Sequence, residues 1–311
     1  MNVLQRTISR YRYLHWSFWA TFTFSLTKIA EKLKIAPHFF REYHNKVLFR
    51  DFRKKWLRKN SAGETYFDFN GILFPDISKN KNDFSSFVLH IFDDIFLMPC
   101  YYDDNYDKAL VNHLDQLMLE GPYGYKDNTF DVTVKKEDVV IDAGAWIGDF
   151  SAYADSKGAI TYAFEPVEAC FYMLCKTIQL DGKKIYPIQK GLGATECELD
   201  IQVVENNTGA SSFVVNRDVG TVQKIKITTL DKFVEENNLE RVDFIKADIE
   251  GAERDFLRGA THVLKNFAPK LAICTYHLPD DPEVLEKIIL EANPDYRVVH
   301  LKNKLFACVV K

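Results

Sequence analysis

Acidic side chains and one histidine stand where predicted strands end in the second half of the sequence. The positions are Asp142, Glu165, Asp248 with Glu250, and His277. In an open α/β sheet the carboxyl ends of parallel strands meet at the edge where ligands bind, so these side chains are expected to converge. Such a group could hold a cationic or hydroxyl-bearing ligand and transfer a proton. Each of these residues, taken alone, could instead be a helix cap or a solvated loop residue without a role in ligand binding.

The turn after the first of these strands reads Asp142-x-Gly144-x-x-x-Gly148. Glycines there let the backbone approach a ligand closely. This turn differs from the dinucleotide-binding fingerprint, which begins with Gly where this sequence has Asp142. The carboxylate of Asp142 would repel the pyrophosphate of a dinucleotide, but it would attract an ammonium or sulfonium group. Glu165, about twenty residues later, can accept both hydroxyls of a ribose. A ribose with a cationic tail and no phosphates indicates S-adenosylmethionine.

Apolar runs alternate with amphipathic segments from about residue 130 onward. The strands that we predict cover 139–141, 160–164, 185–188, 242–246 and 271–276, followed by two short strands at 297–301 and 305–310. The last two are close enough to pair antiparallel. Alternation of strands and helices predicts a doubly wound α/β sandwich, here closed by a hairpin.

The first part of the sequence has a different character. Residues 1–60 look helical and carry fourteen Lys or Arg but three Asp or Glu, on a chain whose net charge is −4. Asn70-Gly71 between apolar runs predicts a hairpin with a type I′ turn. Further helices are predicted over 84–98 and 107–120. We therefore predict an N-terminal helical and hairpin region over 1–125, with an acceptor-binding or oligomer role, and a catalytic domain over 126–311.

The basic N-terminal segment is interleaved with aromatic residues that are unlikely to stay in water. We predict that it forms a homo-oligomer; peripheral contact with an anionic membrane and packing on the acidic body are the alternatives. No apolar run reaches the length of a spanning helix, and the stretch between Arg12 and Lys28 lacks a signal-peptide cleavage site. The overall negative charge argues against a nucleic-acid partner. Six cysteines without zinc-type spacing favour reduced thiols and a cytoplasmic location.

Three stretches resemble the FkbM family of S-adenosylmethionine-dependent methyltransferases. They read V-I-D-A-G-A-W-I-G-D-F-S at 140–151, F-E-P at 164–166, and V-D-F-I-K-A-D-I-E-G-A-E at 242–253 with L-R-G-A at 257–260. The resemblance covers about residues 120–280 and leaves 1–115 unexplained. It implies a class I methyltransferase sheet of seven strands with the last one reversed. The family often has Asn where Trp146 stands, so the contact there is expected to differ.

The resemblance also implies roles for individual residues. Cofactor binding falls to Asp142, Gly144, Ala145, Gly148, Phe150, Ser151, Glu165, Pro166, Gln189, Lys190, Gly191 and Asp248. Asp248, Glu250 and His277 are expected beside the transferred methyl group, with His277 or Asp248 as the base that takes the proton of the acceptor. No metal ligands are assigned, although the same three side chains could hold Mg²⁺ or Mn²⁺. Lys246 is expected either in a buried pair or in catalysis, and Glu253 as a helix-dipole partner.

These features predict an O-methyltransferase that acts on a sugar hydroxyl, in a nucleotide sugar or a surface-glycan intermediate. A non-sugar secondary metabolite is the alternative acceptor. A nicotinamide-dependent dehydrogenase is the alternative enzyme, and Asp142 in place of Gly argues against it. The Asn/Asp-Pro-Pro-aromatic block of amino-methylating enzymes does not follow the fourth strand, so base methylation is not expected. The intact acidic set disfavours a non-catalytic relative that kept the fold.

Overall fold

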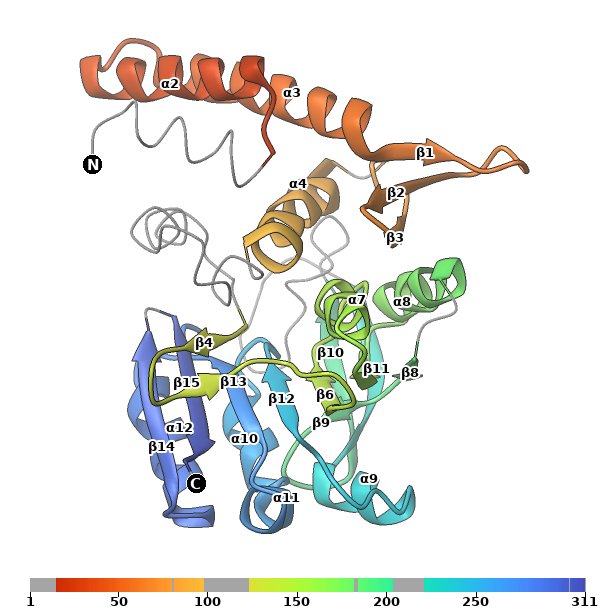
Figure 1. Ribbon diagram of the computed structural model, residues 1–311, viewed down its shortest axis with the longest axis vertical. Helices are drawn as coiled ribbons and strands as arrows, with labels where there is room; N and C mark the ends of the chain where they lie inside the picture. Colours follow the sequence, from red (N-terminus) through yellow and green to blue (C-terminus); the bar gives the residue numbers. More distant parts are fainter. Residues whose placement is uncertain are drawn as a thin grey trace. The chain divides into compact units, whose positions relative to one another are not determined.

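The computed structural model describes residues 15–79, 81–97, 123–181, 184–203, 221–301 and 303–310. The chain divides into two compact units, Met1–Pro122 and Tyr123–Lys311. Figure 1 labels their helices and strands. The predicted helix at 107–120 and the polar segment 206–209 lie outside the described residues.

The first unit begins with two packed helices, α2 (Phe18–Leu33) and α3 (Pro37–Trp56). A three-stranded antiparallel sheet follows, formed by β1 (Leu57–Lys59), β2 (Thr65–Phe69) and β3 (Ile72–Pro75), and then come α4 (Lys81–His90) and a π-helix, η1 (Ile91–Leu97). Asn70 and Gly71 join β2 to β3 with φ of 56° and 95°. The predicted hairpin is confirmed, because both turn residues adopt the positive φ that a type I′ turn requires.

Aromatic side chains form the core of the first unit. The ring of Phe52 on α3 lies 5.5–5.7 Å from the rings of Phe67, Phe69 and Phe92, between centroids. Trp56 packs on Phe69 at 5.4 Å. Part of the aromatic content of the N-terminal segment is therefore buried inside its own unit, although α2 keeps several large rings in solvent.

The second unit contains a seven-stranded sheet in the order β14-β15-β13-β12-β6-β7-β8. Its strands are β6 (Val139–Ala143), β7 (Ile160–Phe164), β8 (Ile185–Ile188), β12 (Phe244–Ala247), β13 (Lys270–Cys274), β14 (Tyr296–Leu301) and β15 (Lys304–Val309). All neighbouring pairs from β13 to β8 are parallel, whereas β15 runs antiparallel to both β13 and β14. This confirms the predicted class I methyltransferase sheet with its last strand reversed.

The strand order changes direction between β6 and β12, because β7 follows on one side of β6 and β13 on the other side of β12. This is the switch point at which doubly wound sheets bind ligands. All four residues of β12 are buried, which is why its sequence is a continuous apolar run broken by one lysine. The structure starts β12 two residues later than predicted, and it ends β13 at Cys274 rather than at Tyr276.

Helices cover the sheet, and the remaining strands form two smaller, separate sheets. They are α7 (Asp149–Ser156), α8 (Glu168–Asp181), α9 (Leu230–Glu236), α10 (Glu253–Arg258), α11 (Thr261–Asn266), α12 (Asp281–Ala292), β4 (Tyr125–Lys126), β5 (Asp131–Val132), β9 (Gly191–Leu192), β10 (Cys197–Val203) and β11 (Thr221–Thr228). Thr229 caps α9 by accepting the Lys232 amide at 3.1 Å. No helix among the described residues is long and apolar enough to cross a membrane.

Candidate active site at the strand switch point

A pocket opens at the carboxyl ends of β6, β7 and β12. Its lining comprises Gly144, Trp146, Phe164, Glu165, Pro166, Val167, Gly191, Leu192, Ile201, Asp248, Ile249, Glu250 and Ala252. Of the predicted site residues, the structure thus brings together Gly144, Glu165, Pro166, Gly191, Asp248 and Glu250 around one space. All of the lining belongs to the second unit.

Gly144 permits the close crossing of two strand ends. Its φ is +78°, and a Cβ at this position would lie 1.9 Å from the carbonyl oxygen of Asp248. Any side chain would therefore push the turn after β6 away from the end of β12. Gly148 closes the same turn with φ of +86°, and a Cβ there would lie 2.7 Å from Leu174 Cδ1. Both glycines of the predicted motif are required by geometry.

Glu165 forms the buried floor of the pocket. Its Oε2 accepts the amide of Trp146 at 2.9 Å, and its Oε1 accepts the amide of Val167 at 2.8 Å. Burial raises the pKa of this carboxyl to about 7, against the opposing effect of these two amides. Each carboxylate oxygen has a further lone pair, so Glu165 can still accept hydroxyls of a ligand.

Asp142 is fully buried beneath the turn and is paired with a cation. Lys246 Nζ lies 3.1 Å from Asp142 Oδ1 and donates to the carbonyl of Gly144 at 2.6 Å, and Ser151 Oγ donates to Asp142 Oδ2 at 2.6 Å. Burial raises the pKa of Asp142 despite the charge of Lys246. The pair supports the glycine turn from below, which is the structural role considered for Lys246.

The remaining predicted cofactor residues do not line the pocket. Ala145 and Phe150 are buried in the core, where Phe150 packs on Phe244 with 5.8 Å between ring centroids. Ser151 serves Asp142. Gln189 is exposed and Lys190 half-buried after β8. A contact of these five residues with a cofactor stays a prediction.

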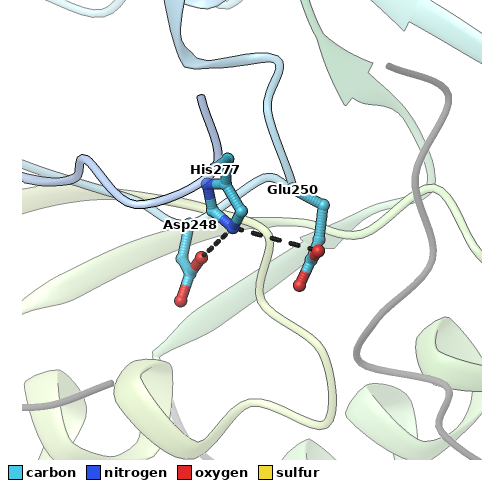
Figure 2. Close-up of side chains that lie close together, drawn as sticks. All are labelled: Asp248, Glu250 and His277. Carbon is cyan, nitrogen blue, oxygen red and sulfur yellow. Dashed lines mark ion pairs between the residues drawn. The ribbon is translucent and has the colours of Figure 1, made fainter. Parts of the chain in front are cut away.

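Three strand-end side chains converge beside the pocket, as Figure 2 shows. The Nε2 atom of His277 points between two carboxylates, 3.5 Å from Asp248 Oδ1 and 3.9 Å from Glu250 Oε2. The His277 side chain is buried, whereas both carboxylates remain partly open to solvent. Two tyrosines complete the group: Tyr123 donates to Asp248 Oδ2 at 2.5 Å and Tyr276 to Oδ1 at 3.3 Å.

Glu253 ties the loop after β12 to His277. Its carboxylate accepts the amide of Ile249 at 2.9 Å and that of Gly251 at 3.1 Å, and it lies 3.1 Å from His277 Nδ1. The loop needs this support because Glu250 and Gly251 both have positive φ, 55° and 101°. Glu253 thus positions two of the three converging side chains, which is more than the predicted dipole interaction.

The charges of this group stabilise a protonated imidazole. Burial alone would lower the pKa of His277, but Glu253, Asp248 and Glu250 together raise it to about 9. Burial would raise the pKa of Asp248, yet Lys246, His277 and Lys304 hold it at about 2. At neutral pH, His277 therefore carries a positive charge and Asp248 a negative one.

The same atoms could hold a divalent cation. Among the described residues, Asp248, Glu250 and His277 each offer a ligand atom within 4.8 Å of the others, and so do Glu253, His277 and Asp281. Carboxylates suit Mg²⁺, and a neutral imidazole suits Mn²⁺. The proton on His277 competes with either ion, because a metal ligand must be deprotonated.

The sequence did not reveal two contributors to this site. Tyr123 lies next to the predicted boundary between 1–125 and 126–311, where no site residue was expected. Tyr276 was predicted only as the last residue of the strand at 271–276. Both contacts reach a residue distant in the sequence, so periodicity could not predict them. A tyrosine next to a predicted strand end is the one signal that could have indicated Tyr276.

A family model of the methyltransferase FkbM domain matches residues 142–298, which include the whole pocket lining and every residue of the strand-end group except Tyr123. The chain belongs to the FkbM methyltransferase family. The FkbM motifs at 140–151, 164–166 and 242–253 each contribute residues to the pocket lining.

Individual relatives are distant. The hexuronic acid methyltransferase AglP of Haloferax volcanii is 24% identical over 172 residues, covering 54% of this chain and 67% of AglP. Methyltransferase sdnD of Sordaria araneosa is 27% identical over 179 residues, covering 45% of this chain and 69% of that protein. A crystal structure of methyltransferase FkbM from Methylobacillus flagellatus KT has 21% identity and a TM-score of 0.46, over 74% of this chain. The chain spans 60% of the length of that FkbM structure.

Proposed function

We propose that this chain transfers a methyl group from S-adenosylmethionine to a hydroxyl of a sugar. The observation that carries the proposal is the strand-end group of Asp248, Glu250 and His277 beside a pocket whose floor is Glu165. The pocket with Glu165 suits a ribose and a cation, and the strand-end group suits an acceptor that must lose a proton.

The cofactor side rests on two acidic features. Glu165 has both oxygens fixed by backbone amides, so its remaining lone pairs are oriented for the two hydroxyls of a ribose. Asp248 and Glu250 give the pocket negative charge next to Gly144, which favours a sulfonium over a phosphate. S-adenosylmethionine supplies an electrophilic methyl group with a good leaving group when it is bound.

His277 is the better candidate for the base. A catalytic base works best when its pKa is near the operating pH, and the pKa of Asp248, about 2, is too low for efficient proton transfer. Glu253 at Nδ1 leaves Nε2 directed toward the carboxylates and the pocket side. Because the pKa of His277 is about 9, turnover should rise with pH between 7 and 9 as the neutral ring becomes available. A flat profile would favour Asp248 instead.

A sugar acceptor is supported by chemistry and by one relative. Carboxylates and the partly exposed hydroxyl of Tyr276 offer several polar contacts for a polyhydroxylated molecule. AglP, whose name describes methylation of a hexuronic acid, is 24% identical to this chain over 172 residues. The chain after β12 reads Asp248-Ile249-Glu250-Gly251, without the proline pair of amino-methylating enzymes. These points favour oxygen as the methyl acceptor.

Calorimetry with S-adenosylmethionine tests the cofactor. The substitution Glu165→Gln should weaken binding by about 1.5–3 kcal/mol, since charge-assisted bonds to the ribose become neutral ones. Glu291→Gln, on the exposed surface of α12, is the matched control and should bind like the wild type. Binding of NAD instead of S-adenosylmethionine would reject the assignment. Mass spectrometry on hexuronic acids and nucleotide sugars should then reveal one added methyl group.

A further inference from the structure

Helix α2 presents its large apolar side chains to solvent. Trp19, Phe22, Leu26, Ile29 and Leu33 recur at intervals of three and four residues and so form one stripe along the helix. Leu26 is half-buried and the other four are exposed. Phe18 before the stripe, with Ile35 and Phe39 beyond it, extends the exposed apolar surface. We call the stripe with these three neighbours the α2 face.

The opposite side of α2 is made of small residues. Ala20, Thr23, Thr27 and Ala30 are buried in a helix that packs against α3. Thr27 Oγ1 lies 3.1 Å from the carbonyl oxygen of Phe40 on α3. A helix of a water-soluble unit normally buries its large side chains and exposes polar ones. Small residues at the helix–helix contact and large apolar residues on the outside are typical of helix pairs whose outer surface contacts lipid.

The hydroxyl groups of α2 are satisfied within the helix. Thr21, Thr23 and Thr27 each donate to the carbonyl four residues earlier, at 2.8–2.9 Å. Ser25 does the same at 3.2 Å. Transfer of this helix to an apolar medium would therefore leave none of these four hydroxyls without an acceptor, which removes the main cost of burying them.

The positive charge around the α2 face indicates which kind of partner can bind there. Residues 17–59 contain eleven Lys or Arg and three Asp or Glu, so the helix pair is strongly cationic. An open cavity next to the start of the face brings Phe18 and Trp19 together with the exposed cations Arg50, Lys54 and Lys55. Two copies of such a surface would repel each other, whereas an anionic lipid surface would attract it.

We propose that α2 docks on an anionic bilayer, with the α2 face in the headgroup region and the helix parallel to the surface. α2 has 16 residues, and it is not among helices that could cross a membrane. Its exposed Trp and Phe side chains are the types enriched at membrane interfaces. A helix with one apolar side and cationic surroundings binds in this way through buried apolar area and electrostatic attraction.

Tryptophan fluorescence of the full chain provides a direct probe. The chain has four tryptophans, and Trp16, Trp56 and Trp146 are buried, so Trp19 is the one exposed to solvent. Vesicles of phosphatidylcholine with about one-third phosphatidylglycerol should shift the emission to shorter wavelength and protect Trp19 from acrylamide. Pure phosphatidylcholine vesicles should have little effect. An unchanged spectrum with both vesicle types would overturn the proposal.

Flotation with the same vesicles compares two sets of variants. Trp19→Ser combined with Phe22→Ser should lower vesicle binding about tenfold, because apolar burial is lost. Tyr172→Ser is the matched control, since Tyr172 is as exposed as Trp19, at 58%, but belongs to the second unit. Equal binding by the double variant and the wild type would reject the α2 face. Light scattering identifies the competing occupant: a dimer that the double variant dissociates, with no vesicle binding, would assign the face to a second copy.

Discussion

Two carboxylate–cation pairs lie on neighbouring strand ends of the same sheet, and they differ in almost every property except charge. Asp142 and Lys246 are sealed under the glycine turn, with side chains 0% and 5% exposed. Asp248 and His277 follow the ends of β12 and β13, where Asp248 is 13% exposed and borders the pocket. The first pair is enclosed by protein donors and acceptors, and the second borders space for a ligand.

From this difference we expect the first pair to support the turn and the second pair to take part in the chemistry. Lys246 pairs with Asp142 and donates to the carbonyl of Gly144, and its charge also acts on Asp248. His277 is held on one side by Glu253, whereas its Nε2 lies more than 3 Å from both carboxylates that it faces. We expect the second pair to contact an entering ligand, because Asp248 lines the pocket. Four predictions test this contrast, from the largest expected effect to the smallest.

Removing the cation of the sealed pair should cost the most stability. Lys246→Met leaves the charge of Asp142 buried without a partner, which is expected to lower the free energy of unfolding by about 3–5 kcal/mol. Urea denaturation followed by circular dichroism measures this loss. Lys232→Met, which breaks the exposed pair with Glu196, should cost less than about 1 kcal/mol. A loss that small for Lys246→Met would contradict the supporting role of the sealed pair.

Removing the charge of the open pair should instead affect turnover. Asp248→Asn keeps the shape of the side chain, and we expect turnover to fall at least about tenfold while affinity for S-adenosylmethionine changes only a few-fold. Asp255→Asn, exposed on α10, is the control for a surface carboxylate. If Asp248→Asn lost stability but kept its turnover, the two pairs would have the same role.

The open pair should also make stability depend on pH. The pKa of His277 is raised from 6.5 to about 9, so the folded state binds this proton more tightly than the unfolded state does. The resulting stabilisation, on the order of 1–3 kcal/mol, is fully present below pH 6.5 and is lost as the pH rises through 9. His277→Gln should remove this slope in urea denaturation series from pH 6 to 10. His300→Gln, in an exposed pair with Glu286, should leave it unchanged.

Metal removal should have the smallest effect. The proton on His277 carries the positive charge that a divalent ion would otherwise supply between the carboxylates. We therefore expect EDTA to change turnover by less than about twofold. Activity that disappears with EDTA and returns with Mg²⁺ or Mn²⁺ would assign Asp248, Glu250 and His277 as ligands instead.

The sequence predicted the sheet well because each strand carries its own local signal. Buried parallel strands read as short apolar runs, and glycine turns follow them, so β6, β7 and β8 were found within a residue or two. The hairpin at Asn70-Gly71 was equally clear, since its turn type demands those residues. The antiparallel pairing of β14 and β15 was predicted from their short connection, and the reversal of the last strand within a class I sheet came from the family resemblance.

The site was predictable as a set of strand ends but not as a set of contacts. Burial decides that Asp142 supports the turn whereas Glu165 faces the pocket, and the two carboxylates look alike in the sequence. The bonds from Tyr123 and from Glu253 depend on how distant loops meet. The exposed stripe on α2 was likewise hidden, because a helical apolar pattern does not reveal which side faces the core.

The single carboxylate of Glu253 has a dynamic consequence. It holds the amides of Ile249 and Gly251 and also the ring of His277, so the loops after β12 and β13 share one anchor. Opening either loop alone would leave a buried charge without its donors. The two loops should therefore open as one cooperative unit, and the amide protons of Ile249 and Gly251 should exchange with solvent together, only in fluctuations that also release His277.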